Sequence, residues 1–245
     1  MFQWEKMGLV FEPQAYLPRP WMQAFAQAPA TLAFEKFIRV YFSCRPAPDE
    51  CGQYVSYSAY VDLDRRDLRR VLDVAEQPIL KLGGLGEFDE FGTYPVSVTR
   101  DGDVVRAFYA GWTRCESVPF NVAIGEAVSV DDGRTFRRVG VGPAIGYSPD
   151  EPFVMSGPKV RRFRSAWQLF YIAGRRWKVV SGRPEPVYKI RMATSANGKD
   201  WKKAHRDLIP SVLEADEAQA SPDVFEAGGR FHMFFCYRAS ADYRQ

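Results

Sequence analysis

Hydrophobic and polar residues alternate in short runs along most of the chain, and the runs are separated by turns rich in glycine, proline, asparagine and aspartate. This alternation is typical of β-strands, because successive side chains of a strand point to opposite faces. Only residues 62–75, DLDRRDLRRVLDVA, have apolar residues near helical spacing. We interpret this window as an outer strand plus a connector, with one or two helical turns as the alternative. The pattern therefore predicts an all-β protein.

The strand pattern repeats about every 64 residues. Four strand-like segments contain a proline near their start, and these prolines are 66, 63 and 64 residues apart, at Pro29, Pro95, Pro158 and Pro222. A second strand rich in aromatic residues follows each of them, at 37–45, 104–114, 167–175 and 231–238. A third strand follows in three of the repeats, at 54–64, 121–133 and 188–198. A repeat of this kind is the usual sign of a modular architecture.

The ends of the third strands predict a fourth strand in each module. Two of them end in Ser-x-Asp/Asn-Gly turns, SVDDG with one additional aspartate at 129–133 and SANG at 195–198, and a bulky residue follows the glycine by three positions, at Phe136 and Trp201. Such a residue can fold back over the turn and begin an outer strand. Four short strands per module describe a β-propeller blade, whereas a β-sandwich would explain the strands but not the period. We expect one propeller domain over 1–245, with modules at approximately 12–80, 81–143, 144–210 and 211–245.

The module count predicts about three and a half blades of a five-bladed propeller. The last module ends after its second strand, and WEKMGLVF (4–11) is expected to serve as a closing strand that covers the last edge. On this count, a protein of 245 residues should associate, aggregate, or melt below a chain extended by roughly 70 to 100 residues. A monomer with an equal melting temperature would instead indicate a ring of four blades.

Composition and charge exclude several classes of protein. Aromatic residues make up 15% of the chain, charged residues 26% and hydrophobic residues 46%, which excludes a disordered or collagen-like protein. The net charge of +3 is too small to indicate a nucleic-acid partner. No run approaches the roughly 18 uncharged apolar residues of a membrane span, and Glu5 and Lys6 interrupt the apolar start. A cytoplasmic protein is therefore expected.

Cysteine and histidine offer little catalytic or metal-binding chemistry here. The four cysteines lack CxxC spacing, and three lie in or beside apolar runs, which favours buried thiols; a bridge between Cys44 and Cys51 is the alternative. Two histidines, His205 and His232, are too few for a His-rich zinc site and do not favour a Ser/His/Asp triad. Carboxylates should therefore carry any chemistry. No cofactor is required, although carboxylates and carbonyls in a central funnel are also calcium ligands.

Several motifs, taken in order and spacing, resemble the five-bladed propeller glycosidases, the superfamily of arabinanases, levansucrases and invertases. They are WEKMGLVF (4–11), GEFDEFGTYPVSV (86–98), FYAGWTR (108–114), the two Ser-x-Asp/Asn-Gly turns and EAQASPDVF (217–225). The sequence looks most similar to an uncharacterised branch found among bacterial polysaccharide genes. The resemblance covers nearly the whole chain. It implies a glycoside hydrolase-like protein that hydrolyses or recognises a glycan or sugar conjugate through a carboxylate-lined funnel.

The resemblance also implies three funnel carboxylates from the first three blades. Acids precede three of the module prolines by five to eight residues, as the pairs Asp89 and Glu90, Asp150 and Glu151, and Asp216 and Glu217, but the first module has none between Arg19 and Glu35. We therefore expect a rotated assignment, with Asp89 as base or nucleophile, Glu217 as general acid and Glu151 tuning their pKa values. An acid in a further blade, and a sugar-binding or protein-interaction propeller without cleavage, are the alternatives.

Aromatic and arginine residues near the strand ends are candidates for binding the sugar. Trp112 follows an aromatic strand, and an indole face can stack on a sugar ring; its alternative place is the core. Arg45, Arg114, Arg175 and Arg238 recur at the ends of the second strands and can clamp an anion or a carboxylated sugar, unless they are merely exposed strand ends. The expected substrate-binding set is Glu90, Tyr94, Trp112, Arg114, Asp150, Arg175 and Arg238.

Overall fold

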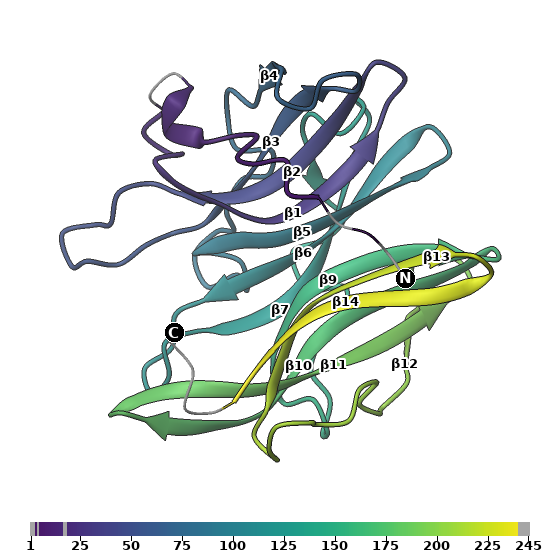
Figure 1. Cartoon of the computed structure of the whole chain (residues 1–245). Helices are drawn as coiled ribbons and strands as arrows, with labels where there is room; N and C mark the ends of the chain where they lie inside the picture. The colour runs from purple at the N-terminus through teal and green to yellow at the C-terminus, as the bar shows by residue number, and fades with distance from the viewer. Residues whose placement is uncertain (1–2, 4, 17–18, 240–245) are drawn as a thin grey trace.

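The computed structural model describes residue 3, residues 5–16 and residues 19–239. Within these residues the chain forms fourteen strands and one short 3-10 helix, η1 (Pro13–Ala15). The strands form three four-stranded antiparallel sheets and one two-stranded sheet, and each sheet is built from consecutive strands (Figure 1). In this part of the chain, no helix is long and apolar enough to cross a membrane.

Each sheet has the strand order of a propeller blade, with its first strand innermost. Blade 1 contains β1 (Ala24–Ala33), β2 (Phe37–Arg45), β3 (Tyr57–Asp64) and β4 (Val71–Val74). Blade 2 contains β5 (Gly92–Asp101), β6 (Val104–Thr113), β7 (Asn121–Ser129) and β8 (Arg137–Arg138). Blade 3 contains β9 (Phe153–Phe163), β10 (Ala166–Val180), β11 (Arg183–Ser195) and β12 (Lys202–Lys203). The two strands of blade 4 are β13 (Ala218–Ala227) and β14 (Arg230–Arg238).

These blades confirm the predicted all-β fold of the propeller type. The aromatic runs form the second strands, and β8 and β12 are the outer strands that Phe136 and Trp201 predicted. Residues 62–75 contain no helix: the chain leaves β3, turns, and returns as the outer strand β4, which pairs with β3. The strand interpretation of this window is therefore correct.

The inner strands of successive blades lie side by side around a common axis (Figure 1). The four module prolines meet there and line one cavity of about 320 Å³, which we call the proline cavity. Each inner strand has a register shift at its proline, as expected because proline cannot donate to the ladder and is accommodated at irregular positions. The repeated proline in the sequence thus marks the propeller axis.

Buried arginines join neighbouring blades. The Arg39 side chain in β2 makes two hydrogen bonds to the Asp62 carboxylate, at 2.7 and 2.6 Å, and donates to the backbone oxygen of Asp132 in blade 2 at 3.0 Å. Arg106 in β6 repeats the arrangement, pairing with Glu126 and donating to the carbonyl of Gly198 in blade 3. The Ser-x-Asp/Asn-Gly turns are therefore the docking points of one blade on the next.

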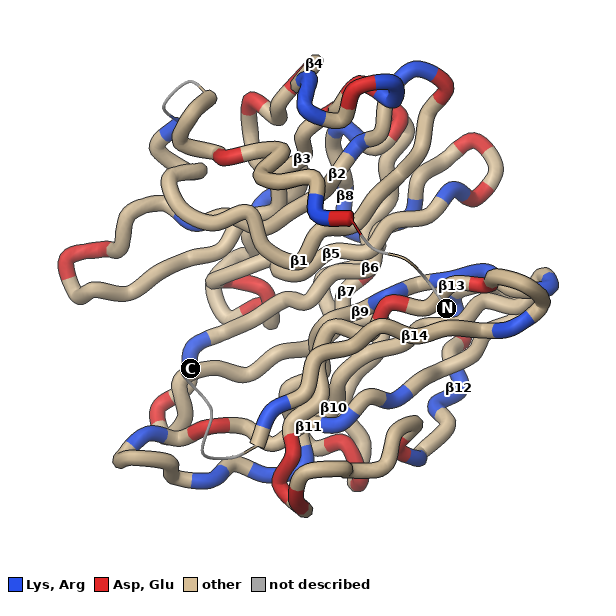
Figure 2. Tube along the Cα trace, viewed as in Figure 1, with Lys and Arg blue, Asp and Glu red and all other residues tan. Residues whose placement is uncertain are grey.

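The hydrophobic core lies between the blades. One cluster joins the facing sides of blades 1 and 2 and includes Tyr41, Val61 and Val98; a second joins blades 2 and 3 and includes Phe108 and Trp167. Acidic and basic residues are interspersed over the loops and strand ends (Figure 2). The structure thus buries apolar faces between its sheets.

The N-terminal segment differs from the expected closing strand 4–11. Trp4 lies outside the described residues, and residues 5–11 form no strand. A strand requires a neighbouring ladder, whereas this segment is held through side chains: the Phe11 ring lies 5.3 Å from that of Tyr16 and 5.2 Å from that of Phe42 in blade 1. The segment therefore packs on blade 1 without extending a sheet.

The cysteines also differ in part from expectation. All four are free, so the alternative bridge between Cys44 and Cys51 is absent. Cys44 is buried in β2, and burial raises the pKa of its thiol to about 12. Cys51 is exposed at the tip of the loop between β2 and β3, where the Asp49 carboxylate accepts its amide hydrogen. Cys115 and Cys236 are exposed as well, so the prediction of buried thiols is correct only for Cys44.

We expect Arg39→Ala to lower the free energy of unfolding by about 3 to 5 kcal/mol, because it leaves the buried Asp62 carboxyl without its partner. The control is Arg70→Ala, which removes an exposed ion pair with Asp64 of 3.7 Å and should cost less than about 1 kcal/mol. Equilibrium unfolding in urea measures both losses. Equal losses in the two variants would contradict the role assigned to the buried arginine.

Candidate functional site

A cavity of about 290 Å³ opens where the inner strands of the blades begin, and we call it the axial cavity. Three blades contribute to it, because neighbouring antiparallel strands bring the start of one strand beside the end of the next. Its lining residues are Arg45, Ser56, Tyr94, Trp112, Phe120, Val122, Val154, Ser156, Ile172 and Tyr188. Tyr94 and Ser156 directly precede residues of the proline cavity, so the axial cavity lies beside the propeller axis.

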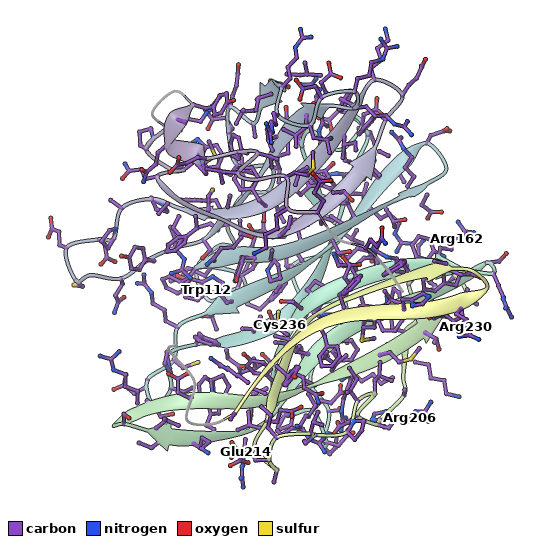
Figure 3. The ribbon with its side chains drawn as sticks, in the orientation of Figure 1. Trp112, Arg162, Arg206, Glu214, Arg230 and Cys236 are labelled. Carbon is purple, nitrogen blue, oxygen red and sulfur yellow. The ribbon has the colours of Figure 1, made fainter. Side chains whose placement is uncertain are left out.

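Trp112 supplies a large aromatic surface to the axial cavity. It lies at the end of β6, on the side of the blades away from Arg162 and Arg230 (Figure 3). A Cβ atom on Gly92 would lie 1.7 Å from Nε1 of Trp112. The indole can therefore rest against the backbone of β5 only because residue 92 has no side chain.

The aromatic wall continues into the long hairpin of β10 and β11. Trp177 in this hairpin has its ring 5.5 Å from that of Phe120 and 6.2 Å from that of Phe153. The buried side chains of Val122 and Val154 lie in the same cluster. Together these residues give the axial cavity an apolar wall that is fixed by packing across blades 2 and 3.

Few polar groups reach the axial cavity, and most of them can donate hydrogen bonds. The Ser56 side chain is only 2% exposed, and its Oγ has no hydrogen-bond partner. Burial raises the pKa of Tyr94, while the nearby Arg45 guanidinium acts in the opposite direction. Burial also raises the pKa of Tyr188, whose hydroxyl accepts a hydrogen bond from Arg238 at 3.1 Å. Both phenols are therefore protonated at neutral pH.

The three acids expected to be catalytic lie outside the axial cavity, and each is 0% exposed. The Asp89 carboxylate accepts hydrogen bonds from the Tyr109 hydroxyl at 2.8 Å and from Arg138 at 2.7 Å. Tyr109 belongs to the second strand of blade 2, and Arg138 belongs to its outer strand. Asp89 thus fixes the loop before β5 to its own blade.

Glu151 occupies the equivalent position in blade 3. It accepts a hydrogen bond from Tyr171 in β10 at 3.0 Å and forms ion pairs with Arg191 at 3.0 Å and Lys203 at 2.6 Å. As at Asp89, a tyrosine of the second strand and a cation of the outer strand hold the acid. The shared spacing before the module prolines is explained by this repeated anchoring.

Glu217 is held differently, by the backbone of the preceding loop. Its carboxylate accepts hydrogen bonds from the amides of Val212 and Leu213 and from the Gln219 side chain, all at 2.8 Å. Asp89 and Glu151 are thus held within their own blades, and Glu217 is held by the loop before β13. None of the three predicted acids lines the axial cavity.

Of the predicted substrate-binding residues, Tyr94 and Trp112 line the axial cavity. Arg238 reaches its edge through the hydrogen bond to Tyr188. Glu90 and Arg114 do not line it: Glu90 accepts the Gly86 amide at 3.0 Å, and Arg114 donates to the carbonyl of Tyr54 at 3.1 Å. These two residues stabilise loops beside the cavity.

Asp150 and Arg175 are also outside the axial cavity. Asp150 pairs with Arg191 at 2.6 Å and with His205 at 3.0 Å, and the Arg191 hydrogen bond holds the pKa of the Asp150 carboxyl well below its usual range. Arg175 donates to the carbonyl of Asp150 at 3.2 Å. Both residues belong to an ionic network on blade 3.

Ser56, Phe120 and Tyr188 line the axial cavity but were not singled out from the sequence. Both Ser56 and Tyr188 belong to the third-strand region of their module: Ser56 directly precedes β3, and Tyr188 lies within β11. That common place is the signal that could have found them.

Among the described residues, no group of three or more His, Cys, Asp or Glu side chains could hold a metal ion. The calcium site considered for the funnel therefore has no cluster of acidic side chains within these residues.

We expect the stability of Glu217→Gln to decrease less on acidification than that of the native protein. Burial alone would raise the pKa of Glu217, but the hydrogen bonds from Gln219 and from the amides of Leu213 and Val212 outweigh it, so the pKa lies below its usual value. A carboxyl with a lowered folded-state pKa adds stability above its unfolded pKa of about 4.3, and this stability is lost as pH falls through the folded pKa.

The measurement is the urea midpoint at a series of pH values between about 7 and 3. Relative to the native protein, Glu217→Gln should be less stable at pH 7, and the difference should shrink as the pH falls. Glu116→Gln, at an exposed position, is the matched control and should follow the native curve. A stability difference between the two proteins that is constant over this pH range would show that the charge of Glu217 does not contribute to stability.

No family model matches this chain. The chain is 32% identical over 242 residues to the uncharacterized proteins Rv1502 and MT1551 of Mycobacterium tuberculosis, and the alignment covers 98% of this chain and 77% of each relative.

Similar solved structures include one described as a glycoside hydrolase, with a TM-score of 0.65, 16% identity, and coverage of 87% of this chain and 65% of that structure. An α-L-arabinofuranosidase from Lactobacillus brevis has a TM-score of 0.61 at 16% identity, over 89% of this chain and 67% of its own. A mutant of the Bombyx mori β-fructofuranosidase BmSUC1, in complex with sucrose, has a TM-score of 0.59 at 17% identity, with coverage of 91% of this chain and 44% of that structure.

The chain thus spans about two thirds or less of the length of these structures. Both the order of its blades and these similarities agree with the fold expected from the sequence motifs. The chain belongs to the family of the mycobacterial proteins Rv1502 and MT1551, and it has the fold of the five-bladed propeller glycoside hydrolases.

Proposed function

We propose that this protein recognises a carbohydrate in the axial cavity. The observation that carries the proposal is the half-buried Trp112 beside a small set of hydroxyl and guanidinium donors at the propeller axis. An aromatic face stacks on the C–H groups of a sugar ring, while a few fixed polar groups set its orientation. A site of this composition suits a ligand with one apolar face and several hydroxyl groups.

The volume of the axial cavity limits how much of a ligand it encloses. At about 290 Å³, it is at the lower end of the roughly 300 to 1,000 Å³ found for small-molecule sites. One sugar residue fits this volume better than a long oligosaccharide. We therefore propose that the cavity holds a terminal or single sugar residue, and that any further residues of a glycan extend into solvent.

Recognition without cleavage is the function that the lining residues favour. Hydrolysis by the usual route needs two carboxyl groups on either side of the glycosidic bond, about 5 to 9.5 Å apart. The described lining of the axial cavity contains no Asp or Glu, and Asp89, Glu151 and Glu217 are buried against other partners. Hydrolysis is the second candidate, favoured by the fold that the chain shares with glycoside hydrolases.

We expect Trp112→Ala to weaken sugar binding at least about tenfold, which corresponds to about 1.4 kcal/mol, because it removes the stacking surface. The measurement is titration calorimetry with a panel of neutral and acidic oligosaccharides that bind the native protein. Trp21→Ala is the matched control: Trp21 is also half-buried, but its indole donates to the carbonyl of Glu76 and lies outside the cavity. Equal affinities for the native protein and Trp112→Ala would contradict the proposal.

A second variant tests the position of the indole rather than its presence. In Gly92→Ala the added methyl group overlaps the Trp112 ring and should displace it, with a loss of affinity similar to that of Trp112→Ala. The same oligosaccharides are assayed for release of reducing ends. Release by the native protein that Asp89→Asn abolishes, in a variant that still folds, would support hydrolysis over recognition alone.

A further inference from the structure

We infer that the axial cavity selects a sugar residue that carries a carboxylate, a uronate, and that Arg45 binds this carboxylate. The inference rests on the proposed function, because it names the class of ligand for the same cavity. Three observations carry it: an arginine without an acidic partner, a buried serine hydroxyl without a hydrogen bond, and a lining without carboxylates.

The first observation concerns the guanidinium of Arg45. The well-buried arginines of the blades pair with acids, as Arg39 does with Asp62 and Arg191 with Glu151. Arg45 lines the axial cavity, and its side chain has no hydrogen bond or ion pair within the described residues. Its guanidinium carbon lies 5.3 Å from the ring centre of Phe25 and 5.4 Å from that of Tyr54. The aromatic rings support the guanidinium without neutralising its charge.

The second observation concerns the Ser56 hydroxyl. Its side chain is 2% exposed, it lines the axial cavity, and its Oγ has no partner. Buried hydroxyl groups are almost always hydrogen-bonded, so an unsatisfied one facing a cavity points to a ligand atom that completes the bond. Cys44 pairs with Tyr57 across β2 and β3, so Arg45 and Ser56 lie opposite each other at the next position of this register. An acceptor group bound by Arg45 is therefore close to Ser56 as well.

The third observation is the charge of the lining. Arg45 is its only charged residue among those described, and the remaining polar side-chain groups are the hydroxyls of serine and tyrosine and the indole N–H of Trp112. A guanidinium presents paired N–H donors that match the two oxygens of a carboxylate. One cation balances a monoanion, whereas a phosphate dianion beside the apolar side chains of Val122, Val154 and Ile172 would keep an uncompensated charge. The chemistry of the cavity thus favours a carboxylate over a phosphate.

The test compares ligands that differ in charge alone. The probes are oligogalacturonate and oligoglucuronate, each as the free acid and as the methyl ester, titrated into the full chain at neutral pH. We expect the acid to bind at least about tenfold more tightly than its ester. This preference should decrease as salt is added, since one charge pair contributes to it, and it should disappear below the pKa of the sugar carboxyl.

Three variants assign the preference to its residues. Arg45→Met should lower the affinity for the acid to that for the ester, Arg45→Lys should retain part of the preference for the acid, and Ser56→Ala should weaken binding of the acid about threefold to fivefold. Arg162→Met is the matched control. Arg162 also lies over an aromatic ring, 5.2 Å from the centre of Trp167, but it is half-exposed, pairs with Asp101 at 3.5 Å and lies at the far end of the blades (Figure 3). This control should bind both probes as the native protein does.

The outcomes separate this inference from the proposed function. If esters or neutral oligosaccharides bind as well as the acids, and this binding depends on Trp112, the carboxylate inference fails and carbohydrate recognition stands. A sugar phosphate that binds more tightly than every uronate also overturns the inference. If no saccharide binds, both fail. If circular dichroism shows that Arg45→Met is unfolded, two other measurements test the role of Arg45: the acid-over-ester preference of Arg45→Lys, and the effect of salt on this preference in the native protein. A preference that neither Arg45→Lys nor added salt changes would overturn the role of Arg45.

Discussion

The contacts of blade 1 with blade 2 and of blade 2 with blade 3 share one interaction, a buried arginine that pairs with an acid of its own blade and reaches the turn of the next. A single blade cannot bury both of its faces, so its stability comes from its neighbours. Arg39 and Arg106 fix the angle and register of each contact because a guanidinium binds in one plane and tolerates little displacement. The hydrophobic clusters between blades provide most of the burial, but they are less directional. The arginines therefore add direction to these two contacts.

Much of the fold was accessible from the sequence because its signals are local. Alternating polarity, the spacing of the prolines and the Ser-x-Asp/Asn-Gly turns each depend on residues that are near neighbours in the chain. They located all the second strands and the outer strands β8 and β12. The segment at residues 5–11 was harder, since its conformation depends on contacts between Phe11 and Phe42, which lie far apart in sequence. Periodicity carries no information about such contacts.

The candidate site was less accessible, because one sequence pattern serves two roles. A carboxylate shortly before an inner strand can enter a funnel or can fix its loop to the blade, and the spacing is the same. Only the partners distinguish the two: Arg138 lies 49 residues after Asp89, and Lys203 follows Glu151 at a similar distance. Tyr94 and Trp112, which line the axial cavity, were among the predicted residues because aromatic residues at strand ends are distinctive. A single serine such as Ser56 has no comparable signal.

The inner prolines have a further consequence for the axis. The inner strands of a propeller face one another across the channel with one edge each, and unpaired strand edges readily join other strands. A proline in every inner strand removes a donor from each edge, and the register shift beside it bends the backbone away from a regular ladder. The facing edges therefore offer fewer hydrogen-bond donors to one another at the level of the prolines. There the four proline rings line a cavity in place of a continuous ladder.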